Sequence, residues 1–256
     1  MTFAWLAFFD AILAIAMIAA GMTGAHFRLI APFMGFQLFA LGFLLSLLGS
    51  IVGFVGIFLT RKPQARAGRN RAWLGTAVCL VIAVPVILTI LGSAKYPAIN
   101  DITTDFDNPP EFVYAQQLQH EPNRDMKYNK AKYADRQLTG YGPIGPVKEH
   151  LDPAAAFARV TEVAKASPNW TITRSDPATN TLEVVATSKL WHFNDDVVIQ
   201  IRPAPDGTSL IEMRSKSRDG IGDFGVNAKR IRRFFDRVAL ARSTSDQNPA
   251  DQDDQP

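Results

Sequence analysis

Arg214 to Phe235 reads RSKSRDGIGDFGVNAKRIRRFF, and this stretch decides the fold. The residues before it, Ser209–Met213, are typical of the end of a strand. After it, apolar side chains recur at helical spacing and predict a helix that begins near Asp223. Asp223 suits the N-cap, because its carboxylate can accept hydrogen bonds from the first turn and oppose the helix dipole. The stretch is therefore a strand-to-helix turn dense in arginine, serine and glycine.

The chain has 256 residues, and its charge is unevenly distributed. Residues 1–92 are almost entirely apolar, whereas residues 93–256 carry most of the charge. Three apolar runs are long enough to cross a bilayer as helices, which takes about 20 residues. They are Phe3–Met22, Met34–Thr60 and Ala72–Gly92. The first run lacks the basic start of a signal peptide, so we expect three retained spans over residues 1–92.

The loop between the second and third spans is strongly basic. It holds Arg61, Lys62, Arg66, Arg69 and Arg71. The positive-inside rule places such a loop in the cytoplasm. The N-terminus is then cytoplasmic, and everything after Gly92 is exported, which in a Gram-negative cell means the periplasm. We therefore predict a multi-pass protein of the inner (plasma) membrane, with the lipid bilayer as its first partner.

Charge and cysteine content limit the other possible functions. The net charge of +3 is small and much of it lies in that loop, so no nucleic-acid partner is expected. The single cysteine, Cys79, permits neither an intrachain disulfide nor a thiol metal site. Asp10 lies in the first span, where a carboxylate costs about 2.5–3.5 kcal/mol at mid-bilayer. The other two spans offer no partner charge at similar depth. We therefore expect Asp10 to lie near the cytoplasmic headgroups and not to form part of a proton or ion pathway.

The exported half begins with irregular structure. Ser93–Pro110 is rich in proline and predicts an extended strap. Val113–Pro146 is polar and rich in tyrosine, and predicts a long surface loop with a short helix around Asn129–Asp135. A helix then starts at Asp152-Pro153, with proline in its first position. Four strands follow, by alternation of apolar residues: Trp170–Arg174, Thr181–Ser188, Asp196–Arg202 and Thr208–Lys216.

These elements predict an α+β domain over residues 93–241. Their order is α-β-β-β-β-α, and short connections make the sheet an antiparallel meander of about four strands. Both helices are expected on one face of this sheet. Residues 242–256 form a polar, acidic tail, which we expect to be disordered.

Three separated motifs resemble one family. They are ITTDFDNPPEF at 102–112, FNDDVVIQI at 193–201 and RSKSRDGIGDFGVNAKRI at 214–231. Together, over roughly residues 95–240, they resemble the DUF1499 family in a membrane-anchored form. The function of that family is unknown, so the resemblance implies domain boundaries and no activity.

The strand-to-helix turn offers candidate ligand-binding residues. They are Arg214, Ser215, Ser217, Arg218, Asp223, Asn227 and Arg230, together with Asp195 and Asp196. Arginines, hydroxyls and a helix N-terminus are what a phosphate or carboxylate would need. The alternative is structural: Arg214 or Arg218 pairs with Asp223 or Asp196, while Asn227 ties the strap to the turn. Both interpretations stay open.

Metal binding and catalysis find less support. His192, Asp195 and Asp196 resemble metal ligands, but alternate strand residues point to opposite faces and a fourth ligand is missing. His120, His150 and His192 have no serine-centred elbow beside them, and the glycines lack the Lys-Ser/Thr of a phosphate loop. We therefore predict no metal, cofactor or catalytic residue. The expected function is a non-enzymatic binding or interaction module of the cell envelope, for an envelope protein or a small anionic or lipidic ligand. The alternatives are a lipid- or anion-binding accessory, or a hydrolase or transferase that acts at the Arg214–Arg230 face.

Overall fold

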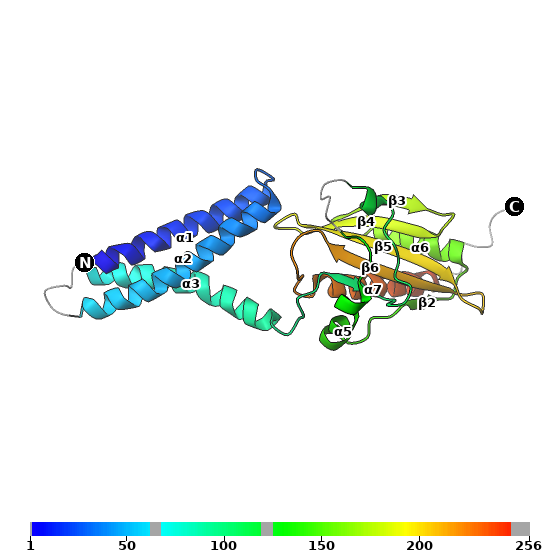
Figure 1. Cartoon of the computed structure of the whole chain (residues 1–256). Coiled ribbons are helices and arrows are strands. Elements are labelled where there is room, and N and C mark those ends of the chain that lie inside the picture. Colours follow the sequence, from blue (N-terminus) through cyan, green and yellow to red (C-terminus); the bar gives the residue numbers. More distant parts are fainter. Residues whose placement is uncertain (1, 62–67, 119–124, 247–256) are drawn as a thin grey trace. The chain divides into compact units, whose positions relative to one another are not determined.

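The structure is a computed structural model that describes residues 2–61, 68–118 and 125–246 (Figure 1). The chain divides into two compact units. The first comprises Met1–Lys95 with the hairpin tip Ser188–Phe193, and the second comprises Tyr96–Thr187 with Asn194–Pro256.

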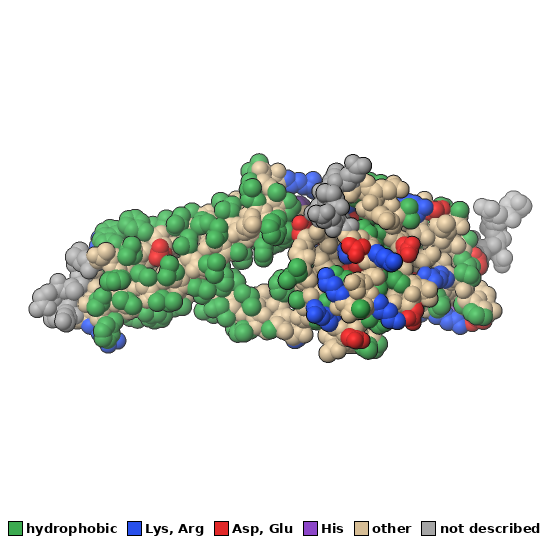
Figure 2. All heavy atoms as spheres, in the orientation of Figure 1, with side chains coloured by type: hydrophobic (Ala, Val, Ile, Leu, Met, Phe, Trp, Pro, Cys, Tyr) green, Lys and Arg blue, Asp and Glu red, His purple; other side chains and the backbone are tan. Residues whose placement is uncertain are grey.

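The first unit is built from three long apolar helices. They are α1 (Thr2–His26), α2 (Pro32–Leu59) and α3 (Arg69–Ser93), and each is long and apolar enough to cross a membrane. Figure 2 shows hydrophobic side chains over most of the visible surface of these helices. The three predicted spans are therefore confirmed as helices. Lys62 and Arg66 of the basic loop lie outside the described residues.

Small residues bring the three helices close together. A Cβ added at Gly49 of α2 would lie 2.6 Å from the Cys79 sulfur of α3 and 3.1 Å from the Asp10 Cβ of α1. Contacts below 3.0 Å do not occur for real side chains, so this crossing needs glycine. Asp10 thus lies against α2 at the helix contact and is half-buried there.

The second unit contains a six-stranded antiparallel sheet with the order β1-β6-β5-β4-β3, and β2 also pairs with β6. Its strands are β1 (Asp101–Thr103), β2 (Val147–Glu149), β3 (Trp170–Asp176), β4 (Thr181–Thr187), β5 (Asn194–Pro203) and β6 (Ser209–Ser217). The predicted meander of four strands is confirmed as β3 to β6. The sheet is wider than predicted, because β1 and β2 share the remaining edge of β6, one beside Arg214–Lys216 and the other beside Ser209–Ile211.

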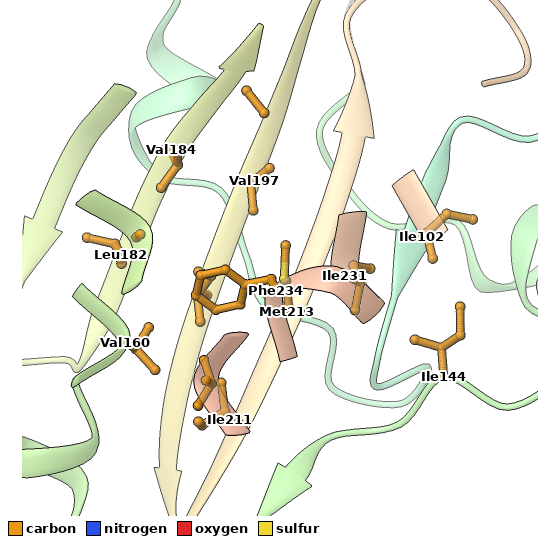
Figure 3. Packing of buried hydrophobic residues seen from close by; sticks show 14 of the residues in the cluster. Ile102, Ile144, Val160, Leu182, Val184, Val197, Ile211, Met213, Ile231 and Phe234 are labelled. Carbon is orange, nitrogen blue, oxygen red and sulfur yellow. The ribbon is translucent and has the colours of Figure 1, made fainter. Parts of the chain in front are cut away.

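The core lies between this sheet and two helices, α6 (Pro153–Lys165) and α7 (Val226–Asp246). Asp152 caps α6 by accepting hydrogen bonds from the backbone N–H groups of Ala154 and Ala155, at 2.9 and 3.0 Å. Figure 3 shows Phe234 and Ile231 of α7 packed over Val197 and Met213 of the sheet. Both helices lie on one sheet face, as predicted from the sequence.

Two segments contain more helix than the sequence predicted, although the short helix expected around Asn129–Asp135 is present. The expected surface loop contains α4 (Tyr114–Gln117) and the helix α5 (Lys130–Tyr141), which is longer than predicted because Tyr133 and Tyr141 are buried in the core. Gln137 of α5 bonds both backbone groups of Thr103 in β1, at 3.0 and 2.7 Å, and so fixes the helix to the strap. The helix α7 also continues through residues 242–246 of the expected tail, and residues 247–256 lie outside the described residues.

Candidate functional site

Strand alternation divides the predicted site between the two faces of the sheet. In β6, Ser215 and Ser217 follow Ile211 and Met213 on the face that carries α6 and α7. Arg214 and Lys216 therefore point to the opposite face. In β5 the same rule places Asp195 on the helix side and Asp196 on the opposite side. The predicted residues do come together, but as two separate networks.

The helix-side network joins β5 and β6 to the first turn of α7. Ser215 donates a hydrogen bond to the side-chain oxygen of Asn227 at 2.6 Å, and the Asn227 amide donates to the Ser217 hydroxyl at 2.9 Å. Arg230 donates to Ser215 at 2.9 Å and pairs with Asp195. The Asn227 amide also reaches the backbone oxygen of Asn100 in the strap, at 3.3 Å. The predicted tie between Asn227 and the strap is confirmed.

Asp223 organises the turn that leads into α7. Its carboxylate accepts hydrogen bonds from the backbone N–H groups of Gly225 and Asn227, at 2.9 and 2.7 Å. Burial raises the pKa of Asp223, and the bonds from Asn227 and Gly225 counteract part of this rise. Gly225 has a φ of +80°, and a Cβ added there would lie 3.2 Å from the Tyr96 ring, so a side chain at this position would be strained. Asp223 thus caps the first turn of α7 through its side chain as predicted, although α7 begins at Val226 and Gly225 occupies the N-cap position.

On the opposite face, Arg218 binds Asp196 through both of that residue's carboxylate oxygens. The Arg218 Nη2 donates to Asp196 Oδ1 at 2.8 Å, and Nε lies 3.2 Å from each oxygen. Asp196 is buried, whereas Arg218 is partly exposed. The predicted pairing of Arg218 with Asp196 is therefore confirmed, and it fixes the end of β6 to β5.

Arg214 has a different partner from those the sequence predicted. Its Nε and Nη2 atoms donate to the two carboxylate oxygens of Asp101 in β1, at 2.9 and 2.8 Å, and both side chains are almost completely buried. The Lys216 Nζ also donates to Asp101, at 3.2 Å. We call these three residues the Asp101 cluster. Asp101 and Lys216 were not among the predicted site residues.

The strap and the segment Val113–Ala115 that follows it lie across this face, anchored by charged side chains. Glu183 of β4 accepts hydrogen bonds from the backbone N–H groups of Val113, Tyr114 and Ala115, at 2.8 to 3.0 Å. Arg202 donates to the Asn108 carbonyl at 2.8 Å, and Arg214 lies 3.4 Å from the Pro110 carbonyl. The sheet thus holds the strap through charge-assisted bonds, which are the stronger kind.

A cavity of about 530 Å³ opens between the strap and the segment that leads into α5. We call it the Arg214 pocket. Its lining combines apolar and charged side chains: Phe106, Asp107, Pro109, Glu111, Phe112, Gln116, Met126, Lys127, Tyr128, Lys130 and Arg214. The guanidinium carbon of Arg214 lies 4.9 Å from the ring centre of Phe112 and 5.3 Å from that of Tyr128. A volume of this size suits a small organic ligand.

The other candidate chemistries gain no geometric support. Asp195 and Asp196 occupy opposite faces of β5, so one metal ion or one substrate cannot reach both. Among the described residues, no group of three or more His, Cys, Asp and Glu side chains is placed to hold a metal ion. His192 belongs to the hairpin tip of the first unit, and His120 lies outside the described residues.

Comparison with known protein families gives a match to this chain. The model of the family described as "Protein of unknown function (DUF1499)" matches residues 101–238. The match begins at Asp101 and ends in α7, so it covers the sheet, both networks and the Arg214 pocket. A search of curated proteins found no match for this chain.

Proposed function

Because the chain belongs to the DUF1499 family and carries three helices able to cross a membrane, we propose that it is a membrane-anchored binding module of the cell envelope. The helices hold the domain at the inner (plasma) membrane, and the domain binds a small ligand in the Arg214 pocket. Cations at the ends of α2 and α3, Arg61, Arg69 and Arg71, support a cytoplasmic loop there and hence an exported domain.

One observation carries the choice of a binding role. The Arg214 pocket combines a buried guanidinium with aromatic walls, and ligand sites are usually apolar cavities with a few fixed polar groups. Asp195 and Asp196 are instead engaged by Arg230 and Arg218 on separate faces. A general base and a nucleophile need a shared substrate position, so the hydrolase or transferase alternative is the weaker proposal.

The test uses the full-length protein, purified gently in detergent and analysed for co-purifying small molecules by mass spectrometry. Gln116 lines the pocket and is exposed, so Gln116→Trp fills the cavity without disturbing the core. Gln117→Trp is the matched control, because Gln117 is also exposed on α4 but is not part of the lining described. We expect a molecule that is present in the wild type and in Gln117→Trp and is lost in Gln116→Trp. A molecule retained equally by all three proteins would contradict the proposal.

A further inference from the structure

The Asp101 cluster carries more positive than negative charge. Arg214 and Lys216 contribute two positive charges and share one carboxylate, so the three residues sum to +1. All three are buried: Asp101 and Arg214 almost completely, and Lys216 to more than nine-tenths. Buried charges are costly unless they are paired. The cluster therefore favours the approach of one further negative charge.

Two hydrogen-bond donors at the pocket can still donate to a negatively charged group. The Arg214 Nη2 atom donates to Asp101 and to the Met126 carbonyl, whereas Nη1 has only the distant Pro110 carbonyl at 3.4 Å among the contacts formed by the described residues. The Tyr128 hydroxyl is buried and has no hydrogen-bond partner within the described part of the chain. Burial and the nearby Asp101 carboxylate raise the pKa of Tyr128 far above its usual value, so the hydroxyl keeps its proton and can donate.

Beyond Arg214 and Tyr128 the lining is mixed. Asp107, Glu111, Lys127 and Lys130 carry formal charges that cancel, and the other wall is largely apolar. Phe106, Pro109, Phe112 and Met126 line the cavity beside Arg214. Phe112 and Met126 are themselves buried and pack with Val198 of the sheet. An inorganic anion would leave this apolar surface uncovered, whereas an acyl chain or an aromatic ring would bury it and gain from the hydrophobic effect.

We infer that the Arg214 pocket binds an organic monoanion, a carboxylate that carries an acyl chain or an aromatic ring, with its charge at Arg214 and Tyr128. A monoanion brings the Asp101 cluster to neutrality, whereas a phosphate dianion would leave it with excess negative charge. This inference rests on the proposed function, because it names the ligand class of the same pocket.

The experiment is calorimetric titration of the full-length protein in lipid nanodiscs, with empty nanodiscs subtracted. The probes are two matched pairs, octanoate with 1-octanol and 2-naphthoate with 2-naphthalenemethanol. Within a pair the body is the same and the charge differs. We expect at least one carboxylate to bind about tenfold or more tightly than its alcohol, as for a hydrogen bond to a charged group. The pair that binds better distinguishes a lipid-derived ligand from an aromatic acid.

Two variants test the origin of this preference without removing Arg214. Tyr128→Phe removes a hydroxyl that has no partner in the described structure, and Lys216→Met removes the excess charge from a side chain that is not among the pocket lining. Each is expected to reduce the preference for the carboxylate about tenfold, while Tyr133→Phe, which alters a hydroxyl 3.4 Å from Asn100, retains it.

Equal binding of carboxylate and alcohol, absence of carboxylate binding, or a preference that survives both variants would overturn the inference. A neutral molecule that co-purifies with the wild type and is lost in Gln116→Trp would leave the proposed function standing and refute only the ligand class.

Discussion

Replacing Asp101 by asparagine should destabilise the DUF1499 domain more than most single substitutions. Asp101→Asn keeps the shape of the side chain but leaves Arg214 and Lys216 buried without their shared carboxylate. Removing one partner of a buried ion pair costs roughly 3–5 kcal/mol, because the remaining charge is uncompensated. For a domain of this size the melting temperature should fall by about 10 °C. Asp101→Asn should also loosen β1, since Asp101 is the first of the three residues through which β1 pairs with β6.

Lys216→Met provides the opposing comparison. It removes one of the two cations, so Asp101 and Arg214 remain as a balanced pair with two direct hydrogen bonds. We expect the free energy of unfolding to change by about 1 kcal/mol or less, because the substitution leaves no buried charge without a partner and replaces the second cation by an apolar side chain of similar volume. The assay is proteolysis of the full-length protein over a temperature series, with cleavage within residues 101–238 as the readout. Equal destabilisation by the two substitutions would refute the argument from charge balance.

Three further predictions concern other parts of the chain. Glu183→Gln should cost about 1–2 kcal/mol and increase hydrogen exchange at Val113–Ala115, because a neutral amide is a weaker acceptor for the three N–H groups that Glu183 now binds; unchanged exchange there would contradict this. Because the pKa of Asp223 is raised, this carboxyl group binds a proton more tightly in the folded protein than in the unfolded chain. Its contribution to the stability of the folded state therefore falls as the pH rises from about 3.8 through the raised pKa. The melting temperature of Asp223→Asn, measured relative to wild type, should increase from pH 4 to pH 7. In a Cys79→Ala background, an impermeant maleimide should label Ala178→Cys in spheroplasts, and Asn70→Cys only after permeabilisation, whereas the reverse pattern would invert the proposed topology.

The predicted elements were those whose periodicity is carried by many residues. The strands β3 to β6 are seven residues long or longer and carry apolar residues at alternate positions in part of their length, and α1 to α3 are long apolar runs, so local pattern suffices for both. The strands β1 and β2 have three residues each, too few for a period to appear. They are strands because β6 offers an unpaired edge, which is a property of the tertiary structure. The helix α5 was underestimated for a similar reason, since its buried face becomes apparent only against β1 and the core.

The candidate site, too, was predictable from the sequence only where a local pattern places its residues. Lys216 could have been found from the sequence, because it lies two residues after Arg214 on a predicted strand and so shares its face. The residue that pairs with both, Asp101, is 113 positions before Arg214 in a segment without regular pattern. Tyr128 lies in the segment expected to be a surface loop. Sequence reasoning therefore located the charged turn but could not assign the partner of its most buried arginine.

The two networks that meet at this turn differ in whether their charged and polar groups are fully paired within the protein. On the helix side, Arg230 pairs with Asp195, and Ser215, Ser217 and Asn227 exchange hydrogen bonds among themselves, so each of these groups has a partner. On the opposite side, one carboxylate serves two cations beside a cavity. The structural and the binding interpretations of the turn consequently apply to different faces of the same strand. The helix side accounts for how the turn is held, and the Arg214 side is where an additional negative charge would be stabilised.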